Sequence, residues 1–255
     1  MRFIRYQIKD EPARRGWVLK DKIGPVDGDI FSQFQRGEAR IPIEEAKILA
    51  PVQPSKIICV GRNYAAHAKE HKTEVPKIPL LFFKPPSAII GPGEQIVLPP
   101  QSQQVEHEAE LAVVIGRHGG KITPEDALNH VLGYTIANDV TARDLQRRDS
   151  QWTRAKGFDT FCPLGPYIET EFDPADALIS CHVNGEMRQM ASTREMVFTV
   201  RQLIAFASSI MTLEPGDLIL TGTPAGVSPL VPNDVVEVSI EGIGSLSNPV
   251  TAESG

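Results

Sequence analysis

The sequence predicts an α+β protein that is mostly β. From Ser55 onward, apolar runs of strand length dominate, and each is bounded by Gly, Pro, Asn or Asp. Few segments carry the signals of a helix. Strands this numerous with so few helices favour a rolled or sandwiched sheet over an alternating βαβ array. The strand-like runs are KIICV, PLLFFK, AIIG, QIVLP, ELAVVIG, LGYTIAND, LISCHVNG, DLILTG and DVVEVSI.

Residues 1–50 are predicted to form a small β-rich N-terminal domain. RFIRYQI and GWVLKDKIGPV look like short strands, and IPIEEAKILAPVQP closes the segment with a proline-marked linker. Residues 51–255 would form the main domain. A chain of 255 residues has the length for one large domain with such an annex.

Two segments carry helix signals. One helix is predicted to begin at Thr123, with Pro124 at its first position. The other runs from about Val200 to Met211, with Thr199 as its N-cap and Gln202 completing a capping box.

The composition argues against several classes of partner. A net charge of −6 leaves no basic footprint for nucleic acid. No apolar run approaches the roughly 20 residues of a membrane span, and the N-terminus lacks the apolar core of a signal peptide. Cys59, Cys162 and Cys181 lie far apart, which fits a reducing compartment better than a disulfide framework. We therefore expect a cytoplasmic protein.

A histidine and a glutamate follow the KIICV run within GRNYAAHAKEH. His67 and Glu70 are three residues apart, so on a helix they share a face and their side chains can meet. A carboxylate that orients an imidazole is a common general base. A surface ion pair has the same spacing, and the pair alone does not decide between the two.

Carboxylates gather at the start of the ELAVVIG run. In VEHEAELAVVIG, Glu108 and Glu110 project to one face of the predicted strand, and Leu111 and Val113 project to the other. Glu106 precedes them. Because adjacent carboxylates repel one another, the pattern favours a divalent cation between them.

Asp139 is the third predicted metal ligand. It lies where the run GYTIAND ends, and Thr141 with Asp144 resembles a capping box that opens a helix. Turn chemistry or a helix cap is the alternative role for Asp139. Three carboxylates without a Cys ligand form a hard oxygen site, which suits Mg²⁺ or Mn²⁺ better than structural zinc. An anionic substrate would then need nearby cations, for which the candidates are Arg62, Lys84, Arg143 and Lys156.

Six segments together resemble the fumarylacetoacetate hydrolase family over residues 55–250. They are GRNYAAHAKEH, LFFKPPSAIIGPG, HEAELAVVIG, GYTIANDVTARDLQ, RAKGFDTFCPLGP and LILTGTPAGV, in this order. The resemblance implies a mixed β-roll, usually in a homodimer. It also implies one Mg²⁺, for which Mn²⁺ or Ca²⁺ can substitute, held by Glu108, Glu110 and Asp139.

The same resemblance implies roles for six further residues. His67 and Glu70 match the catalytic H-x-x-E dyad of the family, which lies on a short helix that covers the substrate. Lys156 matches the catalytic lysine of the A-K-x-F run. Arg62, Gln146 and Thr223 match substrate-binding positions.

The family acts on 2-oxo or 2,4-dioxo acids, including intermediates of aromatic-compound catabolism. The predicted function is a metal-dependent hydrolase that cleaves a C–C bond in acylpyruvate-type 2,4-dioxo acids through a metal-bound pyruvate enolate. A 2-hydroxyhepta-2,4-diene-1,7-dioate isomerase or an oxaloacetate decarboxylase would use the same site. A non-catalytic metal-binding protein would keep the carboxylates but would not need His67, Glu70 and Lys156.

Overall fold

The computed structural model describes residues 1–253, which contain twenty strands, four α-helices and four short 3₁₀ turns. The helices are α1 (Ala65–Glu70), α2 (Arg143–Arg148), α3 (Thr153–Lys156) and α4 (Val200–Ile210). The strands are β1 (Arg2–Gln7), β2 (Arg14–Leu19), β3 (Lys22–Gly28), β4 (Phe34–Arg36), β5 (Ile41–Pro42), β6 (Lys47–Leu49), β7 (Ile57–Gly61), β8 (Leu80–Lys84), β9 (Ile89–Ile90), β10 (Ile96–Leu98), β11 (Val105–Glu106), β12 (Ala109–Ile115), β13 (Val131–Asn138), β14 (Thr141–Ala142), β15 (Cys162–Glu169), β16 (Leu178–Val183), β17 (Glu186–Ser192), β18 (Leu218–Leu220), β19 (Val235–Ile240) and β20 (Gly244–Ala252).

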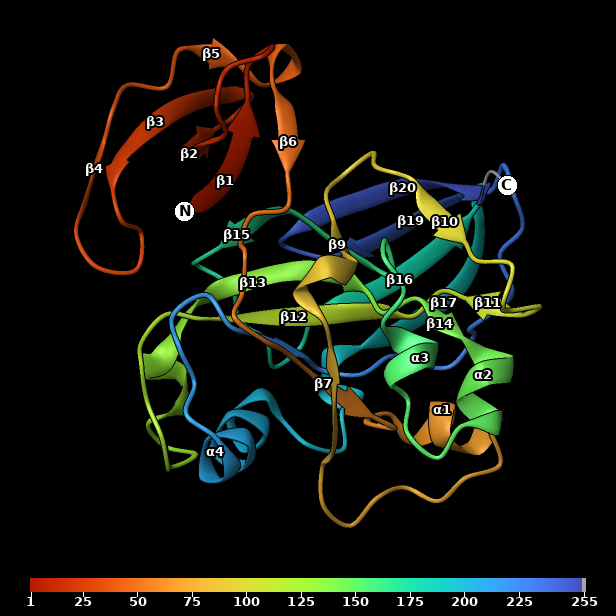
Figure 1. The fold of residues 1–255 in the computed structure, drawn as a ribbon. Coiled ribbons are helices and arrows are strands. Elements are labelled where there is room, and N and C mark those ends of the chain that lie inside the picture. The colour runs from red at the N-terminus through yellow and green to blue at the C-terminus, as the bar shows by residue number, and fades with distance from the viewer. Residues whose placement is uncertain (254–255) are drawn as a thin grey trace.

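The mostly-β class is confirmed, and every run predicted as a strand contains one. A 13-stranded sheet follows the order β4-β3-β2-β1-β15-β13-β12-β18-β7-β8 and includes β5, β6 and β9 beside this path. A five-stranded sheet has the order β10-β20-β19-β16-β17, and β11 pairs with β14. The N-terminal strands form a lobe at one corner (Figure 1), but β1 pairs with β15 and so joins them to the main sheet. The domain boundary at residues 50/51 stays a prediction.

Strand β12 runs through the centre of the molecule and is buried on both faces. Leu111 and Val113 pack into the apolar cluster shared with the five-stranded sheet and α4. Ala112 and Val114 pack into a second cluster on the opposite face, with residues of β7 and β18. The predicted alternation is therefore correct, but the face that Glu108 and Glu110 share continues into core rather than into solvent.

The helix predictions had different outcomes. Helix α4 has the predicted capping box, in which Thr199 and Gln202 exchange hydrogen bonds, and it ends one residue early at Ile210. No α-helix begins at Thr123, where turns lead into a 3₁₀ helix at Ala127–His130. The backbone here closes i→i+3 bonds, from the Asp126 N–H to the Thr123 carbonyl (3.2 Å) and from the Asn129 N–H to the Asp126 carbonyl (3.0 Å), which is the 3₁₀ pattern, and β13 then begins at Val131.

The predicted capping box at Thr141 and Asp144 is wrong. Thr141 belongs to β14, and its hydroxyl donates to the Asp139 carbonyl at 2.8 Å. Ala142 is the N-cap of α2 and supplies no side-chain bond. Asp144 instead accepts hydrogen bonds from Ser102 Oγ (2.6 Å) and from the backbone N–H of Gln103 (3.0 Å), so it anchors the loop before β11.

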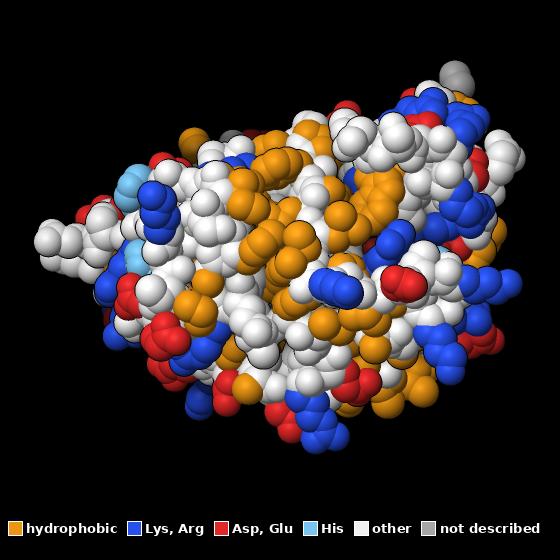
Figure 2. All heavy atoms as spheres, turned by 90° about the horizontal axis from the view of Figure 1, so that it is seen from below, with side chains coloured by type: hydrophobic (Ala, Val, Ile, Leu, Met, Phe, Trp, Pro, Cys, Tyr) orange, Lys and Arg blue, Asp and Glu red, His pale blue; other side chains and the backbone are white. Residues whose placement is uncertain are grey.

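Apolar side chains reach the surface in a band on the face seen from below (Figure 2), the side on which the loop between α1 and β8 lies in Figure 1. This loop and β8, the edge strand of the large sheet, carry exposed Val75, Ile78, Leu80 and Phe83. Contiguous apolar surface of this kind is often buried in oligomers. The homodimer stays a prediction. Residues 1–253 contain no helix long and apolar enough to cross a membrane.

Candidate active site and metal centre

The predicted site residues converge on one cavity of about 300 Å³. The cavity lies where β7 ends and β12 begins, and helices α1, α2 and α3 contribute further residues to its wall. Glu70 contacts His67 just outside the cavity, and Asp139 lies fully buried behind it. The remaining predicted residues line the wall: Arg62, His67, Glu108, Glu110, Gln146, Lys156 and Thr223.

The three carboxylates form one cluster, as the strand pattern predicted. Antiparallel pairing of β12 with β13 sets Ala109 opposite Asn138, which brings Glu108 and Glu110 beside Asp139. One oxygen from each carboxylate lies within 4.8 Å of the others. All three residues are buried, with exposed fractions of 4% or less. Such a cluster requires compensating positive charge.

The pKa values of Glu110 and Glu108 are shifted in opposite directions. Burial raises the pKa of Glu110 well above its ordinary value, and repulsion from Asp139 and Glu108 raises it further. Burial also acts against ionisation of Glu108, but Lys156 and Arg143 outweigh it and hold the pKa of Glu108 well below its usual range. The cluster therefore includes one carboxyl group that the protein's own cations do not neutralise.

Two buried lysines contact the cluster. Lys156 Nζ donates to Glu108 Oε2 (2.8 Å) and to Asp139 Oδ2 (2.6 Å). Burial would lower the pKa of Lys156, but Asp139 and Glu108 raise it to about 12, so the ammonium is charged at neutral pH. Lys84 Nζ lies 2.7 Å from Asp139 Oδ1 and donates to the Val140 carbonyl. The sequence identified Lys84 only as a possible substrate-binding cation, whereas its partner is a carboxylate of the protein.

These residues fit a hard divalent cation. Three carboxylates within reach of a common point, with no Cys in the set, are the ligands that Mg²⁺ and Mn²⁺ prefer. A cation placed among the carboxylates would offset the burial and the repulsion that raise the pKa of Glu110. Glu108, Glu110 and Asp139 are the residues that would hold it.

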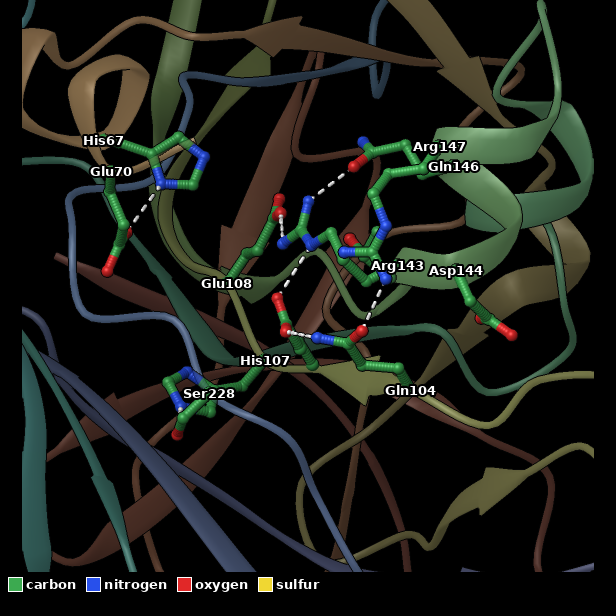
Figure 3. Close-up of polar contacts among 12 residues, drawn as sticks. His67, Glu70, Gln104, His107, Glu108, Arg143, Asp144, Gln146, Arg147 and Ser228 are labelled. Carbon is green, nitrogen blue, oxygen red and sulfur yellow. Dashed lines mark hydrogen bonds and ion pairs between the residues drawn. The ribbon is translucent and has the colours of Figure 1, made fainter. Parts of the chain in front are cut away.

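Arg143 organises the other wall of the cavity (Figure 3). Its guanidinium bonds Glu106 Oε2 through Nε (2.7 Å), Glu108 Oε1 through Nη2 (2.5 Å) and Gln146 Oε1 through Nη1 (2.6 Å). Gln104 donates to the other oxygen of Glu106 at 2.6 Å. Arg143 is 3% exposed and is committed to protein carboxylates, so it serves the architecture of the site rather than a free anion.

His67 and Glu70 lie together on α1, as their spacing predicted. His67 Nδ1 is 3.5 Å from Glu70 Oε2, within ion-pair range but too long for a good hydrogen bond (Figure 3). Both Glu70 oxygens accept the backbone N–H of Gly226, at 3.1 and 3.2 Å. Burial lowers the pKa of His67 to about 4 despite the Glu108 charge. The imidazole is therefore neutral at pH 7, the state a base requires.

Gln189 is a site residue that sequence reasoning missed. Its amide donates to Thr223 Oγ1 (2.8 Å) and to the Pro224 carbonyl (2.7 Å). Its carbonyl accepts the backbone N–H of Ala109 between the two glutamates (3.0 Å). Gln189 thus positions both the Thr223 loop and the start of β12. It lies on β17, a strand the apolar pattern did not reveal, so no sequence signal pointed to it.

Comparison with known proteins identifies the family. The family model described as fumarylacetoacetate (FAA) hydrolase C-terminal matches residues 56–251. The chain belongs to the fumarylacetoacetate hydrolase family. A second model, described as Rv2993c-like, N-terminal, matches residues 1–51. The resemblance inferred from six sequence segments is confirmed.

Relatives in this family differ in reaction. Oxaloacetate tautomerase FAHD2B, mitochondrial, from Bos taurus is 48% identical over 223 residues, covering 82% of this chain and 71% of that protein. A 5-carboxymethyl-2-hydroxymuconate delta-isomerase structure from Mycobacterium smegmatis is 42% identical, with a TM-score of 0.91 and 99% and 100% of the two chains covered. Maleylpyruvate hydrolase from Sphingobium sp. SYK-6, in complex with manganese (II) ion and pyruvate, is 31% identical, with a TM-score of 0.83 over 100% of both chains.

Proposed function

We propose that this protein is a divalent-metal-dependent enzyme for small 2-oxo acids that hydrolyses the C3–C4 bond of 2,4-dioxo acids. The observation that carries the proposal is that neutral, buried His67 lines the same cavity as Glu108 and Glu110. A base and a cluster suited to a divalent cation thus face one small volume. This combination suits a substrate that must bind through a 2-oxo carboxylate and exchange a proton nearby.

The cation expected at Glu108, Glu110 and Asp139 would supply Lewis-acid stabilisation of negative charge on the 2-oxo group of the substrate. The protein's own groups then perform the proton transfers. His67, oriented by Glu70, removes a proton from water as the water oxygen bonds to C4. The C3–C4 bond breaks, C3 receives a proton from protonated His67 or solvent, and the products are a carboxylic acid and pyruvate.

Lys156 has a supporting role in this scheme. Its ammonium is charged and buried, and it lies 5.0 Å from the centre of the Phe82 ring, which limits its access to water. It holds Glu108 and Asp139 and lines the cavity, so it can stabilise an oxyanion that develops at C4. Gln146, whose carbonyl is held by Arg143, leaves its amide N–H groups for the substrate.

The second candidate is a reaction at the same site without attack by water: tautomerisation of oxaloacetate, isomerisation of a hydroxy-dienedioate, or decarboxylation of oxaloacetate to pyruvate and CO₂. The observation favouring it is that His67 and the two glutamates of the carboxylate cluster line one cavity, and proton transfer at C3 requires no further kind of group. The relatives named as an oxaloacetate tautomerase and as an isomerase are also more similar in sequence than the hydrolase structure.

The test uses chelated protein with acetylpyruvate, oxaloacetate and 2-hydroxyhepta-2,4-diene-1,7-dioate, before and after Mg²⁺ or Mn²⁺ is restored. Release of equal amounts of acetate and pyruvate from acetylpyruvate, only with metal, is expected. Enol decay of oxaloacetate without pyruvate, release of pyruvate and CO₂ from oxaloacetate, or rearrangement of the dienedioate would assign the second candidate. Metal binding with no turnover of any compound would favour the non-catalytic alternative. His67→Asn is the matched control, which should bind metal but lose turnover.

A further inference from the structure

A second cluster of potential metal ligands lies on α1 and its C-terminal end. His67, Glu70 and His71 form an H-x-x-E-H pattern, with two histidines four residues apart and a glutamate between them. One ligand atom from each lies within 4.8 Å of the others. None of these residues belongs to the carboxylate cluster, and two of the three ligands are nitrogen rather than oxygen.

Two buried nitrogen atoms in this cluster have no hydrogen-bond partner among the described residues. They are His67 Nδ1 and His71 Nε2, and the His67 side chain is nine-tenths buried. The two rings meet edge to face, with centroids 4.6 Å apart. Leaving two buried polar nitrogens unpaired costs free energy that a shared ligand would recover. A ligand shared by the two rings and Glu70 would satisfy both nitrogens.

The spacing already approaches that of a small tetrahedral metal site. Zn–N bonds of about 2.0–2.1 Å put the ligand atoms of such a site roughly 3.3 Å apart. His67 Nδ1 and Glu70 Oε2 are separated by 3.5 Å. Glu70 can ligate through one oxygen while the other keeps the Gly226 N–H. Only a modest movement of His71 is then needed to complete three ligands.

We propose that His67 Nδ1, His71 Nε2 and a Glu70 oxygen form a second metal site, which takes a borderline transition metal such as Zn²⁺ or Co²⁺. Imidazole nitrogen favours these metals over Mg²⁺, whereas the oxygen-only cluster of Glu108, Glu110 and Asp139 favours the harder cations. Both histidines line the cavity, and Glu70 contacts His67 beside it.

The charges around the proposed site permit a dication. Arg143 and Lys156 are the cations that act on His67, and both are paired with Glu108. Glu108 itself acts on His67 with the opposite sign, and Glu70 contributes a carboxylate directly. The negative charges of Glu108 and Glu70 would therefore offset the positive charges near a bound dication.

Occupancy of this site would have one consequence that rests on the proposed function. A metal on His67 Nδ1 replaces the proton that this nitrogen would direct toward Glu70, and its positive charge opposes protonation of the other ring nitrogen, so His67 could no longer act as a base. Transition metals at this site are then inhibitors, even though the other site needs a divalent cation. The binding itself does not depend on which reaction the enzyme performs.

The experiment titrates the chelated full-length protein with Co²⁺ in excess Mg²⁺, following bound metal by equilibrium dialysis and the visible spectrum. One equivalent with an intense tetrahedral band is expected, because the Mg²⁺-filled oxygen site cannot produce it. Glu110→Gln, which disables the oxygen site, should keep the band. His118→Asn, a matched change at an exposed surface histidine, should also keep it.

His71→Asn should lose the band, and His71→Gln provides the same test if the first variant folds poorly. Half-buried His71 ends α1, so both variants should keep the far-ultraviolet circular dichroism of the parent. An unchanged band in both His71 variants, or the absence of any tetrahedral band in the parent, would overturn the proposal. These readouts need no substrate, so failure of the proposed function would leave them interpretable. If turnover is found, Zn²⁺ should inhibit the parent more strongly than His71→Asn.

Discussion

Removal of the Arg143 guanidinium tests how the cavity wall is held. In the folded protein this group is buried and bonds Glu106 and Glu108 at 2.7 and 2.5 Å, and Gln146 at 2.6 Å. Arg143→Ala leaves two buried carboxylates short of a partner. Breaking a buried pair in this way costs about 3–5 kcal/mol of unfolding free energy. Lys156 still neutralises part of Glu108, which points to the lower half of this range.

The assay is urea unfolding of metal-free protein, with the midpoint and slope followed by circular dichroism. Arg147→Ala is the matched control, because this exposed arginine only donates to Gln104 Oε1 at 2.6 Å. It should cost less than about 1 kcal/mol. In the double variant Arg143→Ala/Glu106→Gln, part of the loss should be recovered, because one unpaired charge is gone. A loss under about 1 kcal/mol for Arg143→Ala would show that the buried carboxylates are neutralised by other groups, and the reasoning above would be wrong.

Three further predictions concern the metal cluster, the dyad and the main sheet. Glu110→Gln should abolish Mg²⁺ binding measured by calorimetry. It should also raise the melting temperature of the chelated protein, because burial, and then repulsion from neighbouring carboxylates, raise the pKa of Glu110, whereas the neutral amide keeps the Gly222 N–H bond. A lower melting temperature would contradict this. His67 has a folded pKa of about 4 against 6.5 in the unfolded chain, so only the unfolded chain gains a proton between these values. Stability should therefore fall as pH drops from 6.5 to 4, by up to about 3–4 kcal/mol from this group, and His67→Asn should flatten the profile measured by urea unfolding at each pH. Asp217→Ala should cost about 3 kcal/mol in the same assay, because this fully buried carboxylate bonds Ser55 Oγ, the Lys56 ammonium and the Glu214 N–H; exposed Asp176→Ala should be nearly neutral.

Local patterns predicted the parts of the protein that depend on neighbours in sequence. The capping box of α4 requires only Thr199 and Gln202, three residues apart, and it was found as expected. The period of two along β12 separated Glu108 and Glu110 from Leu111 and Val113, and this too holds. Local patterns failed for β15, where Pro163, Gly165 and Pro166 hide an eight-residue strand from any apolar count. Its role as the partner of β1, β9 and β13 is visible only in the folded sheet.

The sequence by itself determined the mostly-β class, the family and several of the residues that line the cavity. Only the tertiary structure decided which charges meet. Arg143 and Glu106 are 37 positions apart, and Lys84 reaches Asp139 from the edge strand β8. The physical reason is that strand register and burial select these partners: a buried charge must be matched by whichever opposite charge the fold brings within reach, however distant in sequence. The same applies to the unpaired nitrogens of His67 and His71, which become evident only once burial has removed their water.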